Sequence, residues 1–235
     1  MAHAIEGPQR RAAPRARVVT RPTLVYGFDP LCGWCFVFAP SLAALRRELE
    51  GRVDIELACG GLVVGERVRS MAEMRPYLRS AIPEAEARSG VRFGAGFTEG
   101  LLLRDEVRLA SEPACRALFA ARSLGASSSQ LLDYATQMIE ALYQRGEVTS
   151  DIEPLARAAS AVGLDGGALR ERWDSAPMRA ETEQEFAAAR ALGVSMYPSL
   201  LLRRGEQVEL ILRGFATPAQ AVSLVEAALA RTRPS

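Results

Sequence analysis

The sequence predicts an α/β fold in which a large all-helical insertion separates a strand–helix–strand half from a strand–strand–helix half. Three observations lead to this class. Patterns typical of strands occur only near the two ends of the chain. From residue 65 to residue 193, apolar residues recur with helical spacing instead. The 235 residues are 49% hydrophobic and 24% charged, which is enough apolar material to bury a sizeable core.

The first half begins with a short apolar run, TLVYGF at Thr23–Phe28, which is typical of a buried strand. Apolar residues then recur at helical spacing, which predicts a helix from about Cys32 to Glu50 with a kink at Pro40. Val53–Cys59 alternates apolar and polar residues and predicts a second strand. These elements make a βαβ unit.

The middle of the chain is predicted to contain five or more helices. Ser111 is placed as the N-cap of one of them, because serine before an apolar helical pattern commonly accepts the first free amides. Gly146, Gly163 and Gly193 follow helical runs and mark helix ends. The pattern is least regular between residues 71 and 103.

The second half begins with a predicted hairpin formed by Ser199–Leu202 and Gln207–Leu212. Thr217, Pro218 and Gln220 then supply an N-cap, a first-turn proline and a capping-box partner for a last helix. Without the insertion the order is β-α-β and then β-β-α, which is the order of the thioredoxin fold. We therefore expect a thioredoxin-like domain at residues 23–64 and 194–235, with a helical insertion domain at residues 65–193.

Residues 1–22 are predicted to form a disordered basic tail. Five arginines and one glutamate lie in residues 1–21, whereas the whole chain carries a net charge of only +1. A charge so close to zero gives no reason to expect a nucleic acid or a membrane surface as partner. No apolar run approaches the roughly 20 residues of a membrane-spanning helix. The tail also lacks the apolar region of a secretory signal, so we expect a cytoplasmic protein.

The four cysteines indicate where the chemistry lies. Cys32 and Cys35 form a C-x-x-C pair, while Cys59 and Cys115 stand alone. The only histidine is His3, so a zinc site and a hydrolase with a histidine base are both disfavoured. A C-x-x-C pair that follows a strand and opens a helix is instead typical of redox sites.

The predicted helix brings the two motif cysteines within reach of one disulfide, because residues three apart share a helix face. Unpaired amides at a helix N-terminus favour a thiolate over a thiol, and Cys32 gains most from them. Its thiolate can attack a partner disulfide, and Cys35 can then resolve the mixed disulfide.

The segments FDPLCGWC, ACGG and GVSMYPSLLL resemble the DsbA family of thiol-disulfide oxidoreductases, and within it the predicted cytoplasmic protein-disulfide isomerase branch with a Cys-Gly-Trp-Cys motif. The resemblance implies that Cys32 is the nucleophile and Cys35 the resolving cysteine. It also implies a cis-proline at Pro198 facing the dithiol, with the backbone of Tyr197 available to an extended substrate. No organic cofactor or metal is implied, although glutathione or a thioredoxin-type reductant could serve as co-substrate.

The family resemblance predicts a disulfide reductase or isomerase that acts on protein dithiols and disulfides or on low-molecular-weight thiols. Strongly oxidising members of the family have a histidine next to the second cysteine, where this chain has Trp34. We therefore expect a reduction potential nearer the roughly −270 mV of thioredoxin than the roughly −120 mV of the periplasmic oxidant. Trp34 either faces the substrate or packs over the motif.

Two other functions are compatible with the same fold. One is a glutathione-dependent transferase or isomerase of small molecules, whose relatives typically carry serine in place of Cys32. The other is a non-enzymatic peptide-binding module.

For the remaining candidate residues we favour structural roles. Cys59 and Cys115 are predicted to be core residues, with a second redox pair as the alternative. Asp29 is predicted to end the strand or cap the turn, with proton acceptance as the alternative.

Overall fold

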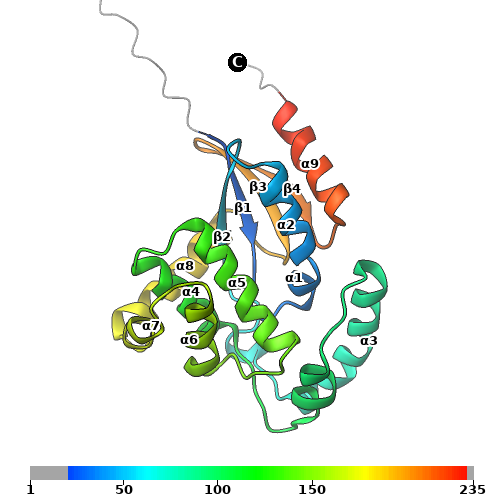
Figure 1. The fold of residues 1–235 in the computed structure, drawn as a ribbon, viewed down its shortest axis with the longest axis vertical. Helices are drawn as coiled ribbons and strands as arrows, with labels where there is room; N and C mark the ends of the chain where they lie inside the picture. Colours follow the sequence, from blue (N-terminus) through cyan, green and yellow to red (C-terminus); the bar gives the residue numbers. More distant parts are fainter. Residues whose placement is uncertain (1–20, 232–235) are drawn as a thin grey trace, which may run out of the picture.

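The computed structural model describes residues 21–231 (Figure 1). Residues 1–20 of the predicted basic tail, and the last four residues of the predicted thioredoxin-like domain, lie outside the described part of the chain. The fold is α/β, with a four-stranded sheet and a helical insertion, as the sequence predicts. The exact domain boundaries at residues 65 and 193 remain a prediction.

The sheet has the strand order β2-β1-β3-β4. β1 pairs with β2 in parallel and with β3 in antiparallel orientation, and β3 and β4 form the predicted hairpin. The bounds of the strands are β1 Thr23–Gly27, β2 Asp54–Ala58, β3 Ser199–Arg204 and β4 Gln207–Arg213. Parallel pairing requires a crossover between β1 and β2, and the helical segment that begins with the motif cysteines supplies it.

The crossover is two helices where the sequence predicts one kinked helix. α1 spans Gly33–Val37 and α2 spans Ala39–Glu48, with Phe38 between them. Pro40 lies in the first turn of α2, where its missing N–H costs no hydrogen bond. The proline therefore divides the helix and leaves a short α1 to carry the C-x-x-C motif.

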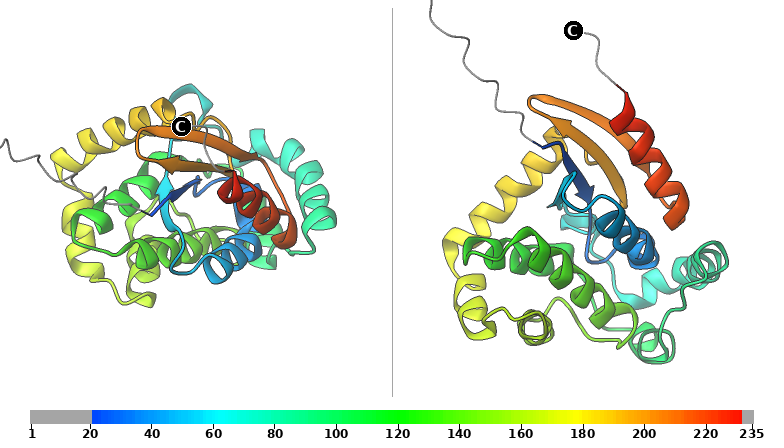
Figure 2. Two further views of the ribbon diagram at one scale, coloured as in Figure 1. Left: turned by 90° about the horizontal axis from the view of Figure 1, so that it is seen from above. Right: turned by 45° about the horizontal axis from the view of Figure 1, so that its top comes forward.

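Helices cover both faces of the sheet (Figures 1 and 2). α2 and α9, which spans Pro218–Ala230, pack together on one face, and the predicted capping box at Thr217 opens α9. On the other face Val25 and Leu201 pack with Ala189 of α8. Successive side chains of a strand point to opposite faces, so Leu24 and Tyr26 belong to the larger core that includes α2 and α9.

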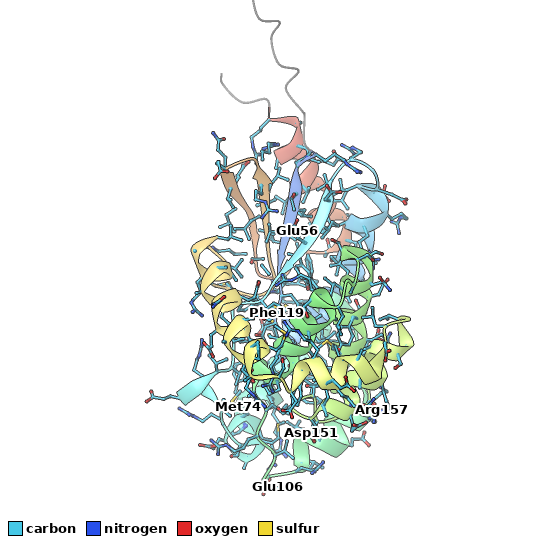
Figure 3. The ribbon with its side chains drawn as sticks, turned by 90° about the vertical axis from the view of Figure 1, so that its left-hand side faces the viewer. Glu56, Met74, Glu106, Phe119, Asp151 and Arg157 are labelled. Carbon is cyan, nitrogen blue, oxygen red and sulfur yellow. The ribbon has the colours of Figure 1, made fainter. Side chains whose placement is uncertain are left out.

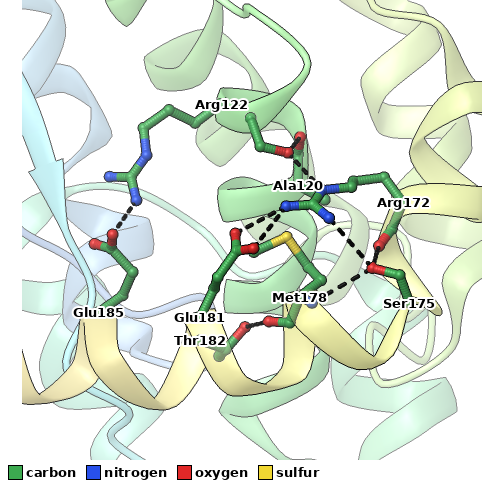
Figure 4. A network of polar contacts seen from close by, with 9 residues as sticks. Ala120, Arg122, Arg172, Ser175, Met178, Glu181, Thr182 and Glu185 are labelled. Atoms are coloured by element: carbon green, nitrogen blue, oxygen red, sulfur yellow. Dashed lines mark hydrogen bonds and ion pairs between the residues drawn. The ribbon is translucent and has the colours of Figure 1, made fainter.

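The insertion contains six α-helices among the described residues: α3 Met71–Ser89, α4 Ser111–Ser123, α5 Ser128–Tyr143, α6 Ile152–Ala161, α7 Gly166–Trp173 and α8 Ala176–Ala191. Ion pairs join its helices, as between Arg122 of α4 and Glu185 of α8 and between Arg172 of α7 and Glu181 of α8 (Figure 4). α3 lies apart from the other five (Figure 1). Within residues 21–231, no helix combines the length and apolar character needed to cross a membrane.

A candidate dithiol site at the start of helix α1

Both motif cysteines lie at the beginning of α1. Cys32 is the N-cap rather than a residue of the first turn, and the backbone N–H of Cys35 donates a hydrogen bond of 3.3 Å to its sulfur. The thiols are free and lie next to each other. The sulfur of Cys32 thus takes the place of a capping oxygen and satisfies one of the free amides at the start of the helix.

The two thiols differ in access. Cys32 is 5% exposed and lines a cleft of about 400 Å³, whereas Cys35 is 2% exposed and does not line the cleft. Burial raises the pKa of the Cys35 thiol well above its ordinary value, and its hydrogen bond with Cys32 adds to the effect. An incoming molecule therefore meets Cys32 first, while Cys35 holds its proton behind it.

The loop before β3 faces the dithiol, and the peptide bond between Tyr197 and Pro198 is cis. The Cys32 thiol donates a hydrogen bond of 3.4 Å to the backbone carbonyl of Tyr197. Tyr197 also lines the cleft. The residues singled out from the sequence as nucleophile and substrate-facing backbone are thus in direct contact.

The hydroxyl group of Tyr197 packs closely against Gly60. A Cβ atom at Gly60 would lie 2.3 Å from the Tyr197 hydroxyl oxygen but 3.6 Å from the ring carbon that bears it. We expect Gly60→Ala to lower the free energy of unfolding by about 1–3 kcal/mol through overpacking. In a Tyr197→Phe background the same substitution should cost much less, because only the hydroxyl clashes. Urea unfolding of the four proteins measures this coupling, and an equal cost in both backgrounds would contradict it.

The cleft beside Cys32 is mainly apolar. Its walls include Leu78 and Ile82 of α3, and Tyr77 and Met196 are large apolar residues on it that are 59% and 50% exposed. Met74, labelled in Figure 3, also lines it. Arg67 is the only charged side chain among the described residues that line this cleft.

The contacts of Trp34 fit both predicted roles, a side chain that faces the substrate and one that packs over the motif. The side chain is half-buried and lines the cleft, so a ligand there can touch it. Its ring also lies 5.9 Å from the ring of Phe215 and 5.0 Å from the guanidinium carbon of Arg88, an exposed residue of α3. The cation over the ring connects the end of α3 to the C-x-x-C motif.

Asp29 is a buried carboxylate that organises the loops around the motif. It accepts hydrogen bonds from the backbone N–H of Leu31 at 2.9 Å and of Leu62 at 2.7 Å, and from the Ser111 hydroxyl at 2.8 Å. Its own backbone carbonyl accepts a bond of 3.0 Å from the N–H of Cys32. These are the contacts of a turn-capping residue.

The predicted role of Ser111 as an N-cap is wrong. Ala110 occupies the N-cap position of α4, and Ser111 is the first helical residue. Its hydroxyl donates to Asp29 and accepts from the backbone N–H of Val63 at 2.9 Å. By turning inward, the serine hydroxyl can both donate to a carboxylate, which is a stronger acceptor than a neutral group, and accept from a backbone amide, so it joins the insertion to the sheet.

Because the pKa of the Asp29 carboxyl is raised, we expect the free energy of unfolding to fall as the pH rises through that pKa. Burial raises this pKa from 3.8 to about 6, although the hydrogen bonds and Arg67 act in the opposite direction. The folded chain therefore binds more protons between those values, and the stabilisation is lost as pH rises through about 6. Between pH 5 and pH 7 the free energy of unfolding should fall by about 1 kcal/mol more in the wild type than in Asp29→Asn. Urea unfolding at both pH values tests this, and parallel curves would contradict it.

Two tyrosines make contacts at the site that the sequence did not predict. The Tyr143 hydroxyl, from the last residue of α5, donates a bond of 2.6 Å to the carbonyl of Leu31. Tyr26, predicted as strand core, is buried with its hydroxyl against the Cys35 thiol, and burial raises its pKa well above the ordinary value. Nothing in the local pattern distinguishes either from an ordinary core aromatic.

A thioredoxin-type sheet with a C-x-x-C pair at the start of its first helix defines the class of protein. The DSBA-like thioredoxin domain family matches residues 23–230, and the chain belongs to this family. The match excludes little more than the two ends, so it includes the helical insertion. No curated protein matches the chain in sequence.

Solved structures with the same architecture include enzymes of disulfide chemistry. A candidate protein disulfide isomerase from Nitrosomonas europaea has a TM-score of 0.78 at 21% identity, covering 89% of this chain and 98% of its own. The cytosolic disulfide reductase DsbM from Pseudomonas aeruginosa has 0.71 at 26%, covering 88% and 98%, and its structure with glutathione (GSH) has 0.69 at 26%, with the same coverage. A 2-hydroxychromene-2-carboxylate isomerase has 0.57 at 15%, covering 88% and 94%. Family and neighbours support an oxidoreductase of thiols and disulfides.

Proposed function

We propose that this protein is a disulfide reductase or isomerase that exchanges disulfides through Cys32 and Cys35. The observation that carries the proposal is the asymmetry of the pair. One thiol lines an open cleft and receives a hydrogen bond from the helix backbone, and the other is buried directly behind it. The cytosolic reductase among its structural neighbours supports a reducing compartment as its setting.

The reaction requires two exchanges. The Cys32 thiolate attacks one sulfur of a substrate disulfide, so a new S–S bond forms, the substrate bond breaks and the first substrate thiolate leaves. The Cys35 thiol then gives up its proton and attacks the Cys32 sulfur, which releases the second substrate thiolate. The substrate gains two electrons, and the enzyme is left with a Cys32–Cys35 disulfide. Isomerisation stops after the first exchange, when another substrate thiol displaces Cys32.

We propose glutathione as the reductant that regenerates the dithiol. The cleft of about 400 Å³ beside Cys32 falls within the size range of small-molecule sites. Arg67, the one charged side chain that lines the cleft within residues 21–231, can pair with a carboxylate of the tripeptide. Two molecules of glutathione reduce the Cys32–Cys35 bond and leave as glutathione disulfide. A related reductase has been solved with this thiol, which supports the assignment.

A redox titration tests the direction of flux. We expect equilibration with glutathione buffers to place the Cys32–Cys35 couple below about −180 mV, on the reducing side of protein disulfide isomerase. The reduced protein should then reduce insulin with glutathione as electron source. A couple near −120 mV would indicate a net oxidant and would contradict the proposal.

A further inference from the structure

The two cysteines outside the motif are buried side by side. Cys59 directly follows β2 and is 2% exposed, while Cys115 lies on α4 and is 0% exposed. They are far apart in sequence: Cys59 belongs to the thioredoxin-like part of the fold and Cys115 to the helical insertion. Neither takes part in the exchange mechanism derived above.

Backbone pairing brings the two segments together. The N–H of Ser111, at the start of α4, donates to the carbonyl of Val63 at 2.8 Å, and the N–H of Val63 donates to the Ser111 hydroxyl at 2.9 Å. Cys115 lies one turn further along α4, and Cys59 lies four residues before Val63. The two thiols lie within hydrogen-bonding reach of each other there, and burial, followed by this contact with Cys59, raises the pKa of the Cys115 thiol.

Cys59 also borders a second cavity, separate from the cleft at Cys32. This cavity has a volume of about 310 Å³ and lies between β2 and the helices α4 and α5. Glu56 of β2 and Phe119 of α4 line it together with Cys59 and mark its position in Figure 3. A small oxidant can reach the Cys59 sulfur from this side, whereas the near-complete burial of that sulfur excludes a peptide.

We propose that Cys59 and Cys115 form a second redox-active dithiol, which hydrogen peroxide closes to a disulfide. The Cys59 sulfur, which borders the cavity, loses its proton and attacks one peroxide oxygen. The O–O bond breaks, water leaves and Cys59 becomes a sulfenic acid. The Cys115 sulfur then attacks the Cys59 sulfur, and a second water leaves. In total two thiols and one peroxide give one disulfide and two waters.

This disulfide would join the sheet to the insertion covalently. It would lie at one end of the loop from Gly60 to Val63, whose Leu62 and Val63 line the substrate cleft. The disulfide would also close the chain between residues 59 and 115 into one loop, which restricts the unfolded chain strongly. Oxidation is therefore expected to stiffen the boundary between the sheet and the insertion without using the Cys32–Cys35 pair.

The test uses the full chain with Cys32→Ser and Cys35→Ser, so that its result is independent of exchange at the motif. After treatment with hydrogen peroxide we expect intact mass to fall by two hydrogens, and a non-reducing peptide map to contain one cross-linked peptide joining Cys59 and Cys115. The midpoint of thermal unfolding should rise by roughly 5–10 °C and return on reduction.

Controls are the same protein with either Cys59→Ala or Cys115→Ala added, in which the cross-link and the shift should both vanish. Two free thiols in the treated, denatured protein, or sulfinic acid in place of the cross-link, would overturn the proposal. A cross-link that leaves the thermal midpoint unchanged would contradict a stiffened boundary between the sheet and the insertion. The mass and the peptide map need no alanine variant, so they decide the matter even if those variants fold poorly.

Discussion

Cys32→Ser is expected to abolish disulfide reduction, with a loss on the order of 10³-fold or more in the insulin assay, because the covalent nucleophile is removed. The substitution is nearly isosteric, and the hydrogen bond from the N–H of Cys35 can pass to the serine oxygen. Stability should therefore change little. Cys115→Ala, which removes a buried thiol outside the motif, should retain the rate.

Cys35→Ser should have the complementary effect of trapping the intermediate. Its serine cannot resolve the bond between Cys32 and a substrate, so mixed disulfides accumulate and are visible on a non-reducing gel.

The same pair of variants separates the competing functions. A binding module would keep its ligand in Cys32→Ser, and a transferase of small molecules would form no protein adduct in Cys35→Ser. A gel without adducts would contradict protein disulfides as substrates.

Asp29→Ala is expected to have the largest effect on stability, a loss of about 2–4 kcal/mol in the free energy of unfolding. The substitution leaves the N–H groups of Leu31 and Leu62 without their acceptor, and each buried unsatisfied group costs about 1–3 kcal/mol. The Ser111 hydroxyl loses its acceptor as well. Urea unfolding at pH 7 measures the loss.

The matched control is Asp174→Ala. The Asp174 side chain is 72% exposed and pairs with Arg179 at the surface, so its loss should change the free energy of unfolding by no more than about 0.5 kcal/mol. Similar values for the two variants would show that the Asp29 contacts contribute no more than a surface pair. A large loss confined to Asp29 would support its role in fixing the loops around the dithiol.

The sheet and the motif could be predicted because their signals are local. Alternation marks the strands, glycines mark helix ends, and the spacing of Cys32 and Cys35 acquires meaning from the strand before it. Ser111 could not be assigned in this way, since its partner Asp29 is 82 residues away. The hydroxyl contacts of Tyr143 and Tyr26 could not be predicted for the same reason, because only the fold brings their partners close.

α3 was hard to predict for a different physical reason. It contains Pro76 and Pro83, which deprive the carbonyls of Ala72 and Arg79 of their helical donors. Both of those residues are exposed, so water can satisfy their carbonyls, and the helix continues through each proline. A sequence pattern contains the prolines but not the exposure that makes them tolerable.

Each of the two tryptophans of this chain lies against an arginine, one of them beside the dithiol and the other within the helical insertion. Trp34 borders the cleft under Arg88, while Trp173 donates its indole N–H to the carbonyl of Pro113 within the insertion. The protein thus carries its own pair of optical reporters. Emission from Trp34 follows what enters the cleft, and emission from Trp173 follows the integrity of the helices that frame it.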